Sequence, residues 1–105
     1  MEIGSIPPVR SLFDNQGDLV GKVDIKKQIE QTILNIEAVL KAAGATLGDV
    51  LKINILMRDP SHFFEMNEVY KRFFKGRSPA RTTVQSNLTV EGMLIEIEAV
   101  ARVPR

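Results

Sequence analysis

The sequence predicts an α+β fold: a two-layer sandwich in which a mostly antiparallel sheet carries two helices on one face. Two segments repeat apolar residues at three- and four-residue steps, which is the period of an amphipathic helix. Three other segments tend to alternate along a period of two, which is typical of strands. Their order along the chain is short strands, helix, strand, helix, and then two strands.

Length and composition limit the possible classes of protein. The 105 residues have room for one domain, which is expected to span residues 1–105. A net charge of +1 without a block of like charges argues against nucleic acid as the main partner. The absence of cysteine excludes disulfides, thiolate catalysis and sulfur-ligated metals. No signal-peptide pattern and no apolar run of about 20 residues is present, so the expected location is the cytoplasm, with no membrane partner.

The first helix is predicted from Asp24 to Ala43. Asp24 can cap the free N–H groups of the first turn, and Gly44 suits the left-handed position after the last turn. Between them, one apolar stripe is formed by Ile25, Ile29, Ile33, Ile36, Leu40 and Ala43.

A strand over residues 50–57 and a second helix are predicted next. Asp59 and Pro60 resemble an N-cap followed by a proline at the first helical position. The helix should run to about Phe74 and end before Gly76 and Pro79, with an apolar stripe of Phe63, Met66, Tyr70 and Phe73. Before the first helix, residues 1–6 and 19–20 are candidate short strands, and residues 7–8 and 15–18 are predicted turns.

The last two strands, ARTTVQS and LIEIEAVA, are expected to form a hairpin centred near residues 88–90. Thr83 would then lie opposite Glu96, with Arg81 diagonal to it. If the helices cover the apolar side, the other face of the sheet is polar and carries Lys52, Asn54, Arg81, Thr83, Gln85, Glu96 and Glu98.

This polar face has two interpretations. It is either a solvated face, which is common in antiparallel sheets, or a site in which Arg81 clamps a carboxylate beside Glu96 as general base. Asn67, beside the stripe of its helix, is either an amide satisfied by backbone or a group that orients a polar partner. His62, the only histidine, lacks the partners of a metal site and is assigned to the surface.

Three strings, NEVYKRFF, SPARTTVQ and LIEIEAVA, resemble the C-terminal half of Rid/YjgF proteins, and AAGATLGDVLK fits the same family. The resemblance covers residues 17–101 and implies a chorismate-mutase-like fold, assembled as a homotrimer with a cleft at each subunit interface. It also implies hydrolysis of reactive 2-imino or enamine acids to 2-keto acids and ammonia, without cofactor or metal. Arg81 would hold the substrate carboxylate, assisted by the backbone N–H of Thr83, Glu96 would polarise the attacking water, and Asn67 would shape the cleft.

The N-terminus departs from the family pattern. The usual first strand with a Tyr-Ser-Gln-type motif is absent, and residues 3–7 resemble a degenerate remnant of the second strand. Catalysis is the implied property that this loss affects most. Two other functions stay open: an endoribonuclease or translation inhibitor, as some members of the family are described, and a non-catalytic trimer that binds small carboxylates or proteins, which the N-terminal loss favours.

Overall fold

The computed structural model describes residues 2–6, 24–76 and 78–103. Over these residues the chain forms four strands and two helices: β1 (Glu2–Ile6), α1 (Ile25–Ala42), β2 (Val50–Met57), α2 (Phe63–Phe73), β3 (Ala80–Gln85) and β4 (Ile95–Val103). Two short 3₁₀ turns, η2 (Leu47–Asp49) and η3 (Pro60–His62), precede β2 and α2. The predicted α+β fold is confirmed. The predicted turns at residues 7–8 and 15–18 and the strand at residues 19–20 lie outside the described residues.

The sheet order is β1-β4-β2-β3. β4 pairs antiparallel with both β1 and β2, whereas β3 pairs parallel with β2. The predicted hairpin between the last two strands is therefore wrong, because β2 lies between them. Residues 58–79, which contain α2, are long enough to carry the chain back for a parallel pairing.

The helix boundaries follow the capping signals of the sequence. The Asp24 side chain accepts a hydrogen bond from the Lys27 backbone N–H, and Gly44 has a φ of +79° just after α1. The Asp59 side chain accepts from the Ser61 N–H at the start of η3, which leads directly into α2. The five large residues of the predicted α1 stripe are buried, but Ala43 is exposed because it forms the C-cap.

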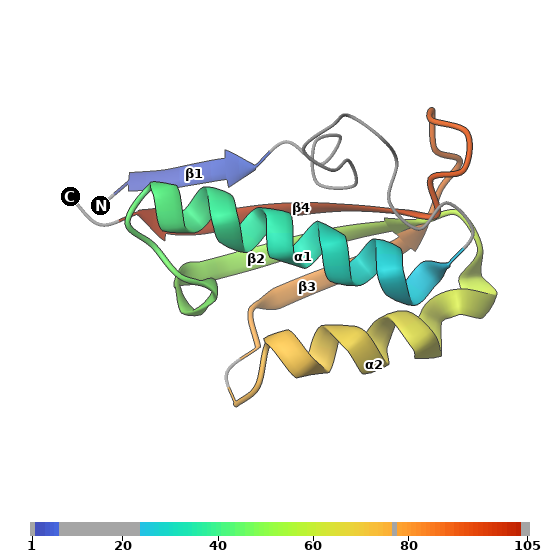
Figure 1. The fold of residues 1–105 in the computed structure, drawn as a ribbon, viewed down its shortest axis with the longest axis horizontal. Helices are drawn as coiled ribbons and strands as arrows, with labels where there is room; N and C mark the ends of the chain where they lie inside the picture. Colours follow the sequence, from blue (N-terminus) through green and yellow to red (C-terminus); the bar gives the residue numbers. More distant parts are fainter. Residues whose placement is uncertain (1, 7–23, 77, 104–105) are drawn as a thin grey trace.

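The two helices pack against each other and cover one face of the sheet, with α1 crossing β4 and β2 and α2 running beside β3 (Figure 1). Met66 and Tyr70 of the predicted α2 stripe are buried, Phe63 and Phe73 are half-buried, and Val69 and Phe74 complete the contact. The sheet contributes Ile53, Ile55, Met57, Ile95, Ile97 and Ala99 to the same core. This core fixes the position of α2 relative to β3, where the candidate site lies.

No helix in the described ranges is long and apolar enough to cross a membrane.

Candidate functional site

The strand register determines which face of the sheet each candidate residue occupies. Arg81 pairs with Ile53 and Thr83 pairs with Ile55, and both isoleucines are buried beneath the helices. Paired residues share a face, so Arg81, Thr83 and Gln85 lie on the helix-covered side. The expectation that these three belong to the polar face is therefore wrong. The half-exposed Val84 lies on the open face in their place.

Arg81 is held by groups from α2. Its Nη1 donates a hydrogen bond of 2.7 Å to Oδ1 of Asn67. Its guanidinium carbon lies 4.7 Å from the centroid of the Tyr70 ring and 5.8 Å from that of Phe63, distances at which a cation is attracted to an aromatic face. The hydrogen bond and the rings together limit the directions in which this guanidinium can point. The interpretation of Asn67 as an orienting side chain thus has a direct contact behind it.

The spacing of α2 explains why these groups converge. Asn67, Tyr70, Lys71 and Phe74 are separated by three- and four-residue steps, so they lie on one side of the helix. The Tyr70 and Phe74 rings stack at 4.6 Å with an interplanar angle of 28°. This pair fixes the ring on which Arg81 rests.

A hollow of about 310 Å³ opens beside these residues. It is called the Arg81 hollow and is lined by Asn67, Tyr70, Lys71, Phe74, Ser78 and Arg81. Its volume lies at the lower end of the range of about 300–1,000 Å³ that is typical of small-molecule sites. Among the described residues, the lining contains two cationic side chains, two aromatic rings and no carboxylate. Its chemistry suits a small anionic ligand.

A second hollow of about 290 Å³ lies farther along β3 and is lined by Met57, Pro60, Phe63, Thr83, Val84 and Gln85. Thr83 and Arg81 are neighbours on the same face of β3, and Phe63 contacts Arg81 while lining this hollow. The Thr83 hydroxyl is buried and makes no hydrogen bond within the part of the chain that the structure describes.

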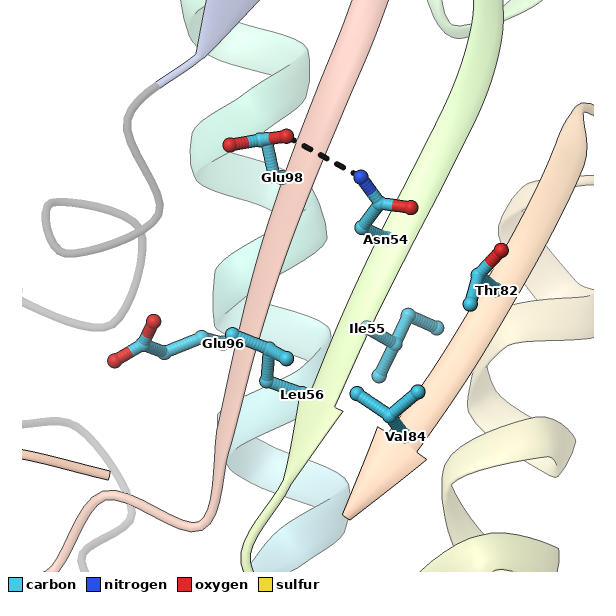
Figure 2. A pocket seen from close by; sticks show the side chains of 7 residues that line it. All are labelled: Asn54, Ile55, Leu56, Thr82, Val84, Glu96 and Glu98. Carbon is cyan, nitrogen blue, oxygen red and sulfur yellow. Dashed lines mark hydrogen bonds between the residues drawn. The ribbon is translucent and has the colours of Figure 1, made fainter. Parts of the chain in front are cut away.

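Glu96 lies apart from these residues. It pairs with Leu56 on β4, and Leu56 in turn pairs with Val84, so Glu96 faces the open side of the sheet. Figure 2 shows this face with both helices behind the strands. Asn54 and Glu98 meet here through a hydrogen bond of 3.3 Å (Figure 2), in a shallow hollow of about 240 Å³. The expected diagonal contact between Arg81 and Glu96 is therefore wrong within one chain: β2 separates them and they occupy opposite faces.

The remaining titratable groups do not form a metal centre in the described segments, where no three His, Cys, Asp or Glu side chains gather. His62 is half-buried, and its Nδ1 has no hydrogen-bond partner among these residues. The backbone N–H of Ser61 lowers the pKa of Asp59 below its usual value, since it donates to the ionised carboxylate. This effect belongs to the start of α2 and not to the Arg81 hollow.

The sequence did not identify Tyr70, Phe63 and Lys71 as neighbours of Arg81. A signal was present, because Tyr70 and Lys71 follow Asn67 at three- and four-residue steps, and Phe63 precedes it by four. The parallel pairing of β2 and β3 was not predicted, however, and without it the spacing of these residues does not show which strand they contact.

Comparison with protein families gives a match over nearly the whole chain. The family model described as Endoribonuclease L-PSP matches residues 4–103. A RutC family protein of Pyrococcus horikoshii is 45% identical over 85 residues, which are 81% of this chain and 67% of that protein. A RutC family protein of Pyrococcus abyssi is 44% identical over 85 residues, covering 81% of this chain and 66% of its own length. The matched region therefore spans about two thirds of these relatives.

Solved structures show the same fold. A protein of the conserved Rid protein family from Yersinia pestis superposes with a TM-score of 0.83 at 36% identity, over 96% of this chain and 80% of that one. A member of the YjgF/YER057c/UK114 family from Mycobacterium tuberculosis gives a TM-score of 0.73 at 38% identity, over 76% of this chain and 69% of that one.

Proposed function

Since the chain belongs to the YjgF/Rid family, whose family model is described as Endoribonuclease L-PSP, we propose that it hydrolyses reactive 2-imino acids to 2-oxo acids and ammonia. The observation that carries this proposal is the setting of Arg81. Its guanidinium lies beside a hollow and contacts the neutral amide of Asn67 and two aromatic rings. No carboxylate of the described residues pairs with it. A substrate carboxylate would supply the missing negative charge in a two-pronged pair.

The proposed reaction needs little from the protein beyond positioning. Water attacks the carbon of the protonated imine, the carbon–nitrogen double bond becomes single, and a proton moves from the water to the nitrogen. The tetrahedral intermediate then collapses: its hydroxyl loses a proton as the carbon–oxygen double bond forms, the carbon–nitrogen bond breaks, and the departing ammonia takes up this proton as ammonium. In this scheme Arg81 and the backbone N–H of Thr83 hold the carboxylate, Asn67 keeps Arg81 in place, and Glu96 takes and returns the proton.

Glu96 can act on a substrate at Arg81 only if it comes from another copy of the chain, because the two residues face opposite sides of one sheet. We therefore propose a homotrimer in which Glu96 of one subunit meets Arg81 of its neighbour. The exposed edge position of β3 supports this assembly, since β3 pairs on one side only within the described residues.

Mixed assemblies test both proposals together. Glu96→Gln and Arg81→Lys should each abolish accelerated ammonia release from 2-imino acids generated in the assay. Co-expression of the two variants should restore part of the activity, because some interfaces then combine an intact Arg81 with an intact Glu96. Glu98→Gln is the matched control, since Glu98 lies on the same face but is engaged by Asn54.

Two inactive variants that remain inactive when mixed would contradict the shared site. If Glu96→Gln were as active as the parent, Glu96 would not be the group that transfers the proton.

The family description favours a second candidate, cleavage of RNA. The same preparations should be incubated with single-stranded RNA in parallel. RNA cleavage that is lost in Arg81→Lys, without any imine hydrolysis by the parent, would favour this alternative over the deaminase.

A further inference from the structure

Two cations line the Arg81 hollow, and neither is neutralised by a carboxylate in the described part of the chain. Arg81 donates to the neutral amide of Asn67, and Lys71 takes part in no ion pair there. Two other cations on the helices do have carboxylate partners. Lys26 lies 3.2 Å from Glu68, and Arg72, the residue next to Lys71, lies 3.7 Å from Glu30. Arg81 and Lys71 are thus two cations without a carboxylate partner among the described residues that border one hollow.

Arg81 and Lys71 reach the hollow from two different elements, β3 and α2. Lys71 follows Asn67 by one helical turn, and Asn67 binds Arg81, so the lysine and the arginine border the same space from the helix and from the strand. The stacked rings of Tyr70 and Phe74 form an aromatic wall of this space. A ligand with one carboxylate at Arg81 and a second anionic group along this wall would satisfy both charges.

A position near the end of a helix offers a simpler role for Lys71, since a cation in the last turn interacts favourably with the helix dipole. Arg72 occupies the same turn, however, and provides this effect without lining the hollow. The dipole explains a cation in this turn, but it does not explain why one of the two borders the hollow.

We propose that Lys71 is a specificity-determining residue that selects dicarboxylic 2-imino acids, those with an acidic side chain, over substrates with an uncharged side chain. Arg81 holds the carboxylate next to the imine carbon and Lys71 binds the distal carboxylate. This inference rests on the proposed function for its chemistry. Its test is one of binding and does not require turnover.

The test compares 2-oxoglutarate with 2-oxobutyrate by calorimetric titration at low ionic strength, with the two product-like acids differing by one charge. An exposed ion pair contributes up to about 1 kcal/mol, so the parent should bind 2-oxoglutarate about fivefold more tightly than 2-oxobutyrate. Lys71→Gln should remove this preference while leaving 2-oxobutyrate binding within about twofold, and added salt should reduce the parent's preference. Lys75→Gln is the matched control, since Lys75 is an exposed cation outside the hollow.

A parent that binds both acids equally, or neither, would overturn the inference, as would a preference that persists in Lys71→Gln. Inorganic phosphate that binds as tightly as 2-oxoglutarate would also overturn it, because the site would then recognise negative charge alone and not two separated carboxylates. Hydrolysis of 2-imino acids without this preference would overturn the inference but leave the proposed deaminase intact. A Lys71-dependent preference without ammonia release would support the inference and contradict the deaminase.

Discussion

Arg81 shows why the alternation of side chains along β3 did not reveal which face of this edge strand is covered by the helices. The segment ARTTVQS contains a single large apolar residue, Val84, and the rule that apolar side chains face the core places Val84 under the helices. β3 is an edge strand, however, and α2 covers it with aromatic rings. An arginine can lie against such rings, because its stem is apolar and its planar head stacks on them.

Replacement of Arg81 by lysine tests whether this arginine binds the substrate carboxylate. Arg81→Lys keeps the charge but loses the planar fork, and a charge-assisted pair of this kind contributes about 1.5–3 kcal/mol. The affinity for 2-oxobutyrate should fall roughly tenfold to a hundredfold. Titration of both proteins measures the change. Equal affinities would mean that the arginine has only a structural role.

The buried Thr83 hydroxyl allows a prediction about stability. It has no hydrogen-bond partner within the described residues, and a buried polar group without a partner destabilises the fold by about 1–3 kcal/mol. Thr83→Val keeps the shape and removes the hydroxyl, so the free energy of unfolding should be unchanged or higher. Urea denaturation measures it. A clear loss of stability would show that the hydroxyl has a partner outside the described segments.

At the level of elements, local signals were sufficient for the helices and strands but not for strand pairing. Asp24, Gly44, Asp59 and Pro60 mark their boundaries through backbone chemistry that involves only near neighbours. Pairing depends on contacts between distant segments. The segment 86–94 is short enough to suggest a hairpin, yet it carries the chain past the end of β2 to its other side.

Arg58, the first residue after β2, holds this connection. Its guanidinium donates to the backbone carbonyls of Leu88, Val90 and Met93 at 2.8, 3.1 and 2.8 Å. From α1, the buried side chain of Gln28 adds a donor to Gly92 and an acceptor for the Leu94 N–H. These bonds satisfy backbone groups that have no strand partner.

Arg58→Ala should therefore be strongly destabilising. It leaves three partly buried carbonyls without their charged donor, and the loss should be about 2–4 kcal/mol in the free energy of unfolding. Arg72→Ala is the control: it removes an exposed ion pair and should cost well under about 1 kcal/mol. Chemical denaturation of both variants measures the difference. Similar losses in the two would mean that the Arg58 contacts contribute little.

At the level of the whole molecule, the open face of the sheet and the edge of β3 are the surfaces at which the proposed trimer would associate. Val84 is 45% exposed, Leu56 beside it is half-buried, and Glu96 and Glu98 lie on the same face. Threefold closure would cover this mixed surface and pair the edge. No local pattern of residues in one chain indicates the symmetry of an assembly. The trimer was therefore suggested by the resemblance of the sequence motifs to a family that forms trimers.

The trimer proposal predicts a single species of about three times the 11.7 kDa chain mass at micromolar concentration. Sedimentation velocity measures the mass directly. The substitution Val84→Lys, which introduces charge on the open face, should shift the protein towards monomer, whereas Phe64→Lys, at an exposed helix position, should not. A parent that sediments as a monomer would contradict both the assembly and the shared active site.

The insertion of β2 between β3 and β4 also affects how the chain reaches its native state. The two strands nearest in sequence must end up unpaired with each other, although closing a short loop between them costs less entropy than any other strand contact. A contact between them would keep the connection at residues 86–94 from passing the end of β2. Native pairing instead joins β2 to strands that are more distant in sequence, a pattern that correlates with slower folding, and the Arg58 contacts with residues 88–93 form beside the end of this central strand.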